Sequence, residues 1–512
     1  MLAKTFGSAV HGVDATIITV EVSEGQGQNF FIVGLPDGAV KESTHRVESA
    51  IKQTDFFFPR TKVVVNLAPA DIRKEGSAYD LPIALGIIHA SGQSNLKSLE
   101  DYVIMGELAL DGALRPIKGV LPIAIEARKK GLKGFILPIE NASEASIVNN
   151  LDIIGVNTLR EAVDFLKGTL QIEPLITDTR DIFFNSQNDY DADFSHVQGQ
   201  ENIKRALEIA AAGGHNVIMI GPPGAGKTML AKRIPSILPP LSLQEALETT
   251  KIHSVAGKLG TKASLISTRP YRSPHHTISD AALVGGGGNP QPGEISLAHN
   301  GVLFLDELPE FKRSALEVMR QPLEERKVSI SRARWAVEFP SSFMLIASMN
   351  PCPCGYYNHP EKECVCGPGV VQKYLNKISG PLLDRIDLHV EVTPVKFEQL
   401  SSNRKSESST DIRERVIKAR EIQTVRFKDH PAIYCNAMMP SQMVKEICEI
   451  NTAGVALLKK AMERLQLSAR AYDRILRVAR TISDLAGTED IRAEHLAEAI
   501  QYRSLDRENW AG

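Results

Sequence analysis

The chain has 512 residues with 59 basic and 61 acidic side chains, which gives a formal net charge of −2. Because the charge is nearly balanced, binding of an anionic polymer would need a local basic surface. With 43% hydrophobic and 23% charged residues, the composition is typical of globular domains. No apolar run approaches the ~20 residues that cross a bilayer, and the first residues lack a signal peptide's apolar core. We therefore expect a cytoplasmic protein without a membrane partner.

The first 170 residues predict an α+β domain, because β-like runs follow one another directly and also alternate with helical runs. The expected strands are 16–22, 30–33 and 62–66, and the expected helices are 40–53, 80–90 and 121–130. Four other segments resemble the proteolytic domain of Lon, which implies a Lon-like, ribosomal S5-like fold. These segments are 66–70, 74–77, 106–112 and 114–123.

The Lon-like region differs from that family at the positions of the two catalytic residues. A Lon peptidase needs a serine nucleophile and a lysine that lowers the proton affinity of the serine. Against the family's motifs, Ala78 stands where the nucleophile belongs and Leu121 where the lysine belongs. Ser77 and Lys118 would form a shifted pair, but covalent catalysis tolerates little misplacement. The resemblance therefore implies a scaffold without peptidase activity, with an ATP-dependent peptidase as an alternative.

An acidic stretch at 171–195 shows neither a helical nor a strand period and is rich in aspartate and asparagine. We interpret it as a linker between domains. A helix is expected to begin at 196–200 and to end at Gly213 and Gly214. This helix opens the second domain, which we expect to extend over 196–400.

The segment 217–229 combines a buried strand of apolar residues with a complete GxxxxGK[ST] motif that leads into a helical run. In such a loop, backbone N–H groups turn toward phosphates, the lysine neutralises the β- and γ-oxygens, and the hydroxyl holds Mg²⁺. The motif therefore predicts ATP and Mg²⁺ as cofactors. The predicted nucleotide contacts are Gly221, Pro222, Pro223, Gly224, Ala225, Gly226, Lys227 and Thr228.

A second apolar run, 302–305, ends in Asp306 and Glu307, and a third, 343–349, ends in Asn350. In a parallel sheet these side chains emerge at the carboxyl ends of the strands, where ligands bind. Asp306 is expected to join the loop's threonine on Mg²⁺, and Glu307 to accept a proton from the attacking water. Asn350 is expected to hold that water or to sense the γ-phosphate, which is the sensor-1 role of AAA+ proteins.

Several segments, in order along nearly the whole chain, together resemble the magnesium chelatase-like YifB/ComM family. They are the Lon-like region, the phosphate loop, and 271–276, 285–290, 305–311, 350–355 and 468–474. The resemblance implies an α/β protein in which an AAA+ core follows a Lon-like domain and precedes a helical lid at 401–512. It also implies a ring-forming ATP hydrolase, expected as a homo-hexamer.

The family resemblance further implies a DNA helicase that acts on single-stranded or branched DNA in recombination or natural transformation. An alternative is a metal-insertion motor like magnesium chelatase, although no segment resembles a porphyrin site. Helices of the lid are expected, from apolar residues three and four apart, at 411–426, 441–449, 452–465, 469–486 and 493–502.

Two arginines are assigned roles by the resemblance. Segment 380–388 resembles the arginine-finger motif, which implies that Arg385 reaches the γ-phosphate bound by a neighbouring subunit. A structural Arg385, paired with a nearby aspartate, is the alternative. Arg470 takes the place of the sensor-2 arginine, which contacts the γ-phosphate across the cleft. Arg474 is the alternative, and two ordinary charges on a helix surface are another.

The alternating run 326–339 reverses around Arg332 and Arg334, as a β-hairpin would. Its basic tip, with Trp335 beside it, suits contact with phosphates and bases in a central channel. Lys327, Arg332 and Arg334 are therefore candidate DNA contacts, and an ordinary solvated turn remains the alternative.

Four of the six cysteines lie close together in the sequence: Cys352, Cys354, Cys364 and Cys366. Four thiolates can hold a tetrahedral Zn²⁺, although these CxC pairs make a tighter chelate than the usual CxxC pairs. A small knuckle of reduced thiols is the alternative, because disulfides do not suit a reducing compartment.

Overall fold

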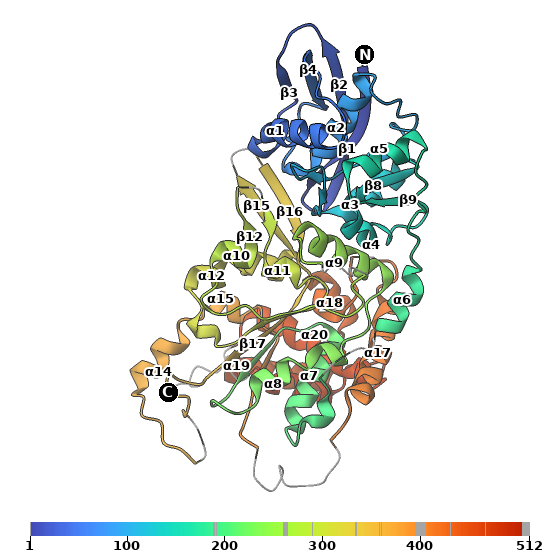
Figure 1. The fold of residues 1–512 in the computed structure, drawn as a ribbon. Helices are drawn as coiled ribbons and strands as arrows, with labels where there is room; N and C mark the ends of the chain where they lie inside the picture. The colour runs from blue at the N-terminus through green and yellow to red at the C-terminus, as the bar shows by residue number, and fades with distance from the viewer. Residues whose placement is uncertain are drawn as a thin grey trace. The chain divides into compact units, whose positions relative to one another are not determined.

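The computed structural model describes residues 2–187, 190, 192–259, 265–288, 290–332, 335–357, 359, 361–395, 406–430, 432–465 and 467–503. The chain divides into two compact units (Figure 1). The first contains Met1–Asn185 and Leu243–Ile266, and the second contains Ser186–Ser242 and Ser267–Gly512. None of the described helices is long and apolar enough to cross a membrane.

The first unit is built on a mixed sheet whose strands lie in the order β3-β4-β2-β1-β5-β8-β9. β1 and β4 are antiparallel to β2, whereas β5, β8 and β9 continue the sheet parallel to β1. The strands are β1 (Leu2–His11), β2 (Asp14–Gly25), β3 (Phe30–Val33), β4 (Lys62–Ala68), β5 (Tyr102–Ile104), β8 (Gly134–Pro138) and β9 (Asp152–Val156). The helices between them are α1 (Gly38–Gln53), α2 (Asp80–Ala90), α3 (Val120–Lys129), α4 (Ala142–Ala145) and α5 (Leu159–Lys167). The predicted strands and helices of this region are confirmed.

The first unit also contains α9 (Leu243–Val255), which the sequence places between the phosphate loop and the acidic pair. Glu144 holds the end of α9 to the start of α3, because it accepts hydrogen bonds from the Ser254 hydroxyl and, at 3.0 Å, from the N–H of Leu121. The N–H of Gly119 also donates to the carbonyl of Ser254, at 3.1 Å. A helix from the middle of the sequence thus belongs to the N-terminal unit.

The predicted linker, 171–195, contains a helix, α6 (Thr179–Ser186), where we expected irregular chain. Asp178 accepts the N–H of Asp181 at 3.3 Å, so an aspartate that we interpreted as a mark of irregular chain instead caps a helix. Helix α7 (Glu201–Gly213) also begins later than predicted, because the two residues before it have positive φ angles that a helix excludes.

The second unit is built on a parallel sheet with strand order β11-β14-β17-β10-β18. Its strands are β10 (Val217–Ile220), β11 (Tyr271–Arg272), β14 (Val302–Leu305), β17 (Met344–Met349) and β18 (Leu388–Glu391). The three predicted strands of this region are confirmed. Alternate residues of β10 face opposite layers, since Val217 packs into one hydrophobic cluster and Ile218 into the other.

Helices from distant parts of the chain cover the two faces of this sheet. The C-terminal helices form as predicted and share the cluster of Val217 with α7. They are α17 (Ser409–Arg426), α18 (Ser441–Ile447), α19 (Thr452–Leu465), α20 (Ala469–Leu485) and α21 (Ala493–Gln501). The other cluster is covered by α10 (Asp280–Val284), α11 (Glu294–Leu297), α12 (Arg313–Val318) and α13 (Arg320–Glu325).

Glu144 gives the first unit a pH-dependent stability. Burial raises the pKa of Glu144 above the usual 4.5, although hydrogen bonds from Ser254 and Leu121 favour the carboxylate. An acid with a raised pKa in the folded state costs stability as the pH rises from about 4.5 through that pKa. We expect Glu144→Gln to remove this loss, so the variant gains on the wild type in free energy of unfolding as the pH approaches neutrality. Urea unfolding at several pH values, with the exposed Glu140→Gln as control, checks this; parallel pH curves would contradict it.

Candidate functional site

The phosphate loop leaves the carboxyl end of β10 and enters helix α8 (Lys227–Ala231). Gly224 and Gly226 have φ angles of +79° and +88°, which residues with a Cβ atom rarely adopt. A Cβ atom at Gly224 would meet no atom within 4 Å, so the loop leaves open space where phosphates would lie. The glycines of the motif therefore stand where the backbone needs them.

Lys227 is buried among neutral partners. Its ammonium group donates to the carbonyl oxygens of Gly221 at 2.6 Å and Pro222 at 3.0 Å, and to the side-chain oxygen of Asn350 at 3.1 Å. Burial lowers the pKa of Lys227, and the charges of Asp306 and Glu307 partly oppose this effect. A cation with this little solvent and no direct carboxylate partner is suited to bind phosphate oxygens.

Thr228 and Asp306 meet as the sequence predicts for a Mg²⁺ site. The Thr228 hydroxyl donates to one oxygen of Asp306 at 2.7 Å, and Ser348, the penultimate residue of β17, donates to the other. Hydroxyl and carboxylate oxygens are the ligands that Mg²⁺ takes in such sites. The residues present therefore fit Mg²⁺, with Ser348 orienting the carboxylate.

Glu307 has a neighbour that we did not predict. Its carboxylate lies 3.5 Å from Nδ1 of His276, and the rings of His275 and His276 lie 4.1 Å apart, centroid to centroid. The backbone of Glu307 has φ +54°, which is uncommon outside glycine. The strand order explains this approach, since β11, which precedes the two histidines, pairs with β14, and the carboxyl ends of neighbouring parallel strands meet at one edge.

Gln200, which precedes α7, also contacts the phosphate loop. Its side-chain amide donates to the carbonyl of Ala225 at 3.0 Å and to that of Thr393 at 3.4 Å. This contact places the start of α7 beside the loop that would hold the phosphates. The predicted lead-in helix thus lies next to the nucleotide site, although it begins after Gln200.

Arg385 lies at the opposite, amino edge of the sheet. It precedes β18, and its carbonyl accepts a hydrogen bond at 3.0 Å from the side chain of Asn216, which precedes β10. Its guanidinium group, with 7% of the side chain exposed, pairs with Glu324 and donates to the carbonyl of Pro381. The four residues of β10 span ~13 Å, so Arg385 and the phosphate loop of the same chain lie at different ends of the strand.

Arg470 lies beside Arg385, with its Nη1 atom 3.6 Å from a carboxylate oxygen of Asp384. We expect Arg470 to contact the γ-phosphate across the cleft, and the structure places it at the amino edge and not at the phosphate loop of the same chain. Arg474, the alternative, pairs with the buried Asp387. Although burial raises the pKa of Asp387, the Arg474 guanidinium holds it below its usual range. Arg474 is therefore engaged in the structure of the amino edge.

A cavity of about 430 Å³ lies at this amino edge. Its charged lining residues are Glu324, Arg326, Asp387, Arg470, Asp473, Arg474 and Arg477. The four arginines outnumber the three acidic groups, so the lining carries a small net positive charge.

The predicted hairpin is confirmed by β15 (Lys327–Arg332) and β16 (Trp335–Pro340), which pair antiparallel. Lys327 is paired across the hairpin with Glu338 at 2.8 Å, and this hydrogen bond raises the pKa of Lys327. Arg334 and the side chain of Arg332 lie outside the described residues. Lys327, a candidate DNA contact, is thus already paired with an acidic partner.

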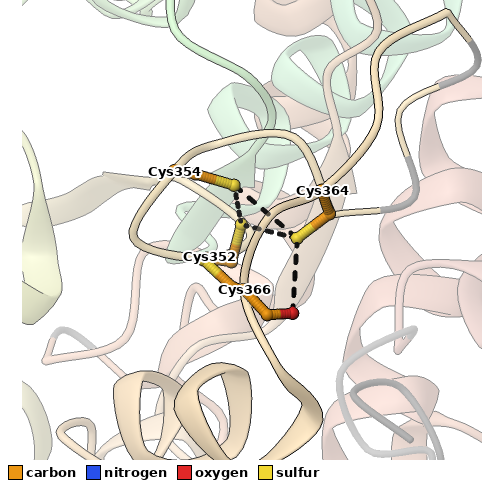
Figure 2. Close-up of side chains that lie close together, drawn as sticks. All are labelled: Cys352, Cys354, Cys364 and Cys366. Atoms are coloured by element: carbon orange, nitrogen blue, oxygen red, sulfur yellow. Dashed lines mark hydrogen bonds between the residues drawn. The ribbon is translucent and has the colours of Figure 1, made fainter.

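The side chains of Cys352, Cys354, Cys364 and Cys366 converge on one small volume, with all four sulfur atoms within 4.8 Å of one another (Figure 2). The sulfur of Cys352 lies 3.3 Å from that of Cys354 and 3.7 Å from that of Cys364. The nearby His359 makes other contacts, because its Nδ1 accepts hydrogen bonds from two backbone N–H groups at 3.0 Å. The donor set of the cluster is four thiols.

The two residues of the alternative peptidase pair have other neighbours. The Ser77 hydroxyl donates to the carboxylate of Glu107, and the side chain of Lys118 lies against Gly257. Activation of a serine nucleophile needs the base within hydrogen-bond reach. The described residues of the first unit thus offer no contact between Ser77 and Lys118.

The chain is similar to known proteins along nearly its full length. The model described as "Subunit ChlI of Mg-chelatase" matches residues 18–141, "Magnesium chelatase, subunit ChlI" matches 193–400, and "Magnesium chelatase, subunit ChlI C-terminal" matches 406–503. Lon protease 2 of Bacillus subtilis is 33% identical over 159 residues, which cover 28% of this chain and 27% of that protein.

Two relatives extend over almost the whole sequence. Competence protein ComM of Haemophilus influenzae is 44% identical over 510 residues, which cover 99% of this chain and 98% of the relative. The protein YifB of Escherichia coli is 43% identical over 503 residues, which cover 98% and 96%. These matches extend over nearly the whole chain, so the phosphate loop, the acidic pair and the cysteine segment lie within the length that they cover. The chain therefore belongs to the magnesium chelatase-like YifB/ComM family.

Proposed function

We propose that the protein is an ATP-driven, ring-forming DNA helicase or translocase that acts on single-stranded or branched DNA, with branch migration in recombination or natural transformation as its task. The name of the relative Competence protein ComM supports the link to transformation. A protein named DNA repair protein RadA, 30% identical over 117 residues and 23% of this chain, supports a role on DNA.

The observation that carries this proposal is the separation of two half-sites on the parallel sheet. Lys227, Thr228 and Asp306 lie at the carboxyl edge, whereas Arg385 and Arg470 lie at the amino edge. An arginine held there cannot neutralise the γ-phosphate of its own chain. A closed ring, in which each chain presents its amino edge to the carboxyl edge of the next, completes every site. A homo-hexamer is the assembly that we propose.

At each carboxyl edge, the chain's own residues have distinct tasks. Lys227 would bind the β- and γ-phosphate oxygens, and Thr228 and Asp306 would hold Mg²⁺, which supplies positive charge opposite these oxygens. Glu307 takes a proton from the attacking water, and Asn350 positions that water.

In the single chain, Arg385 is paired with Glu324. In the proposed ring, the phosphates bound by a neighbouring chain would replace Glu324 as the partner of Arg385. Because the arginine is released from one anion only to meet another, ATP hydrolysis is tied to contact between subunits.

The hairpin of β15 and β16 supports DNA as the substrate of the motor. Its tip, at 332–335, carries two arginines and a tryptophan, which suit backbone neutralisation and base stacking. In the same unit, the four-cysteine cluster is the proposed site of Zn²⁺. The metal-insertion motor remains the second candidate, because the family models are those of a magnesium chelatase subunit.

The test of the proposed function is the rate of ATP hydrolysis with and without forked or four-way DNA. We expect DNA to stimulate the wild type, and Glu307→Gln to bind ATP but to lose about 10²- to 10⁴-fold in turnover, because the base for water is gone. A rate that no form of DNA changes would sink the translocase and favour the metal-insertion motor.

The hairpin is tested in the same assay. The double variant Arg332→Ala, Arg334→Ala is expected to lose stimulation by DNA while basal turnover stays unchanged. Lys327→Ala is the matched control, because the Lys327 charge is already paired with Glu338. Equal loss in both variants would contradict a specific role of the tip.

A shared site predicts complementation between two inactive variants. Lys227→Ala lacks the phosphate contact and Arg385→Ala lacks the finger, a loss that costs about 10³-fold or more in turnover. In an equal mixture, about a quarter of the interfaces combine the intact loop of one variant with the intact arginine of the other. We expect ATPase activity to reappear when the two variants are mixed and their subunits exchange between rings. Persistent inactivity in mixed rings of proven composition would show that Arg385 does not act across the interface.

The contact between His276 and Glu307 predicts a smaller effect. Without the imidazole, the Glu307 carboxylate loses the neighbour that holds it, so we expect His276→Ala to reduce kcat by about tenfold with little change in ATP affinity. His275→Ala, which removes the adjacent ring, serves as control. Equal effects of the two substitutions on kcat would argue against a specific role for His276.

A further inference from the structure

The cysteine cluster is joined to the nucleotide site by contacts that the proposed function does not use. We propose that Zn²⁺ bound by Cys352, Cys354, Cys364 and Cys366 fixes the position of Asn350 and of the phosphate loop, so that the presence of the metal controls ATP binding and turnover. This inference deepens the proposed ATPase and rests on it for the identity of the nucleotide.

The spacing of the sulfur atoms fits a bound zinc ion. In a tetrahedral site with Zn–S distances of 2.3 Å, the sulfur atoms lie about 3.8 Å apart. The closest sulfur pairs of the cluster lie 3.3, 3.6 and 3.7 Å apart, and no pair is more than 4.8 Å apart. All four cysteines are free thiols, so no disulfide accounts for their approach.

The segment that carries the thiols has little else to hold it. Between β17 and α14 (Pro368–Leu375), its described residues form neither helix nor strand. Its hydrophobic cluster consists of Cys352 and Val371 with a few partly buried neighbours, and Val365 is 85% exposed. A long connection with so small a core is ordered most readily by a metal cross-link.

The first contact with the nucleotide site is through the chain itself. Asn350 and Cys352 are separated by a single residue, so their Cα atoms are at most about 7 Å apart. Cys352 is fully buried and packs against Val371 of α14. A metal that holds Cys352 therefore restrains the residue that we assign to the water.

The second contact is between the cysteine loop and the phosphate loop. Gly355, which follows the first cysteine pair, donates its N–H to the carbonyl of Cys352 at 3.0 Å and has φ +83°. A Cβ atom at Gly355 would lie only 2.5 Å from Cδ of Pro223 in the phosphate loop. The turn made by the cysteine pair thus rests directly on the loop that binds phosphates, and movement of one requires movement of the other.

The experiment compares metal content with nucleotide affinity in the full-length protein. The wild type, purified without chelator, is expected to contain one zinc ion per chain, the content of a four-thiolate site. Cys364→Ser combined with Cys366→Ser is expected to lose the zinc, to bind a fluorescent ATP analogue about tenfold more weakly, and to lose turnover by about 10-fold or more. The single substitution Cys366→His, which keeps Cys364 and offers another zinc ligand at 366, is expected to retain zinc, nucleotide affinity and turnover. Cys448→Ala, at a buried cysteine outside the cluster, is the control and should leave zinc content, nucleotide affinity and turnover unchanged.

Gly355→Ala separates the metal from its effect on the site. It leaves all four ligands in place, so zinc content should remain at the wild-type value, whereas the added methyl group presses on Pro223 and should weaken nucleotide binding. The inference would be overturned if the wild-type protein contained no zinc, or if a zinc-free variant kept wild-type ATP affinity and kcat. It would also be overturned if the mass of the intact protein showed disulfides between these cysteines. Because these readouts involve no DNA, failure of DNA stimulation would reject the translocase and leave this inference standing.

Discussion

Strand β10 has a neighbour on each side, and the function of the second unit depends on that central position. At its carboxyl end the chain turns into the phosphate loop, while β17 and β14 bring Asn350 and Asp306 to the same edge. At its amino end, Asn216 binds Asp387 at 2.9 Å and so fixes the start of β18 beside Arg385. One short strand thus sets both the distance and the direction between the phosphate loop and Arg385, which we propose as the two halves of a shared nucleotide site.

The carboxyl edge is a set of mutually dependent contacts around this strand. Lys227 is held by Asn350, Thr228 by Asp306, and Asp306 by Ser348 of β17. The cysteine segment adds a second layer, since it continues from Asn350 and rests on Pro223. Substitution of a residue in this layer would therefore act on the nucleotide through position and not through charge, which a comparison of KM with kcat can separate from loss of a phosphate ligand.

The elements with strong local signals were predictable from the sequence. Three strands of the second sheet, β10, β14 and β17, and the C-terminal helices follow directly from apolar periodicity, and the phosphate loop from its glycines and lysine. Contacts between distant segments were not. The pairing of Arg385 with Glu324 and the approach of His276 to Glu307 depend on strand order, which periodicity does not encode. The start of α7 and the helix α6 were missed because positive φ angles and a capping aspartate are local details that composition hides.

Helix α9 makes the two units interleave along the sequence. Because it leaves the ATPase part of the chain and joins the N-terminal unit, the backbone passes between the units at three places, near 185, 242 and 266. The two units therefore do not correspond to two consecutive stretches of the sequence. A chain begun at Ser186 would keep α9 but lose Glu144, its anchor, and would expose a helix face made for a partner in the same polypeptide.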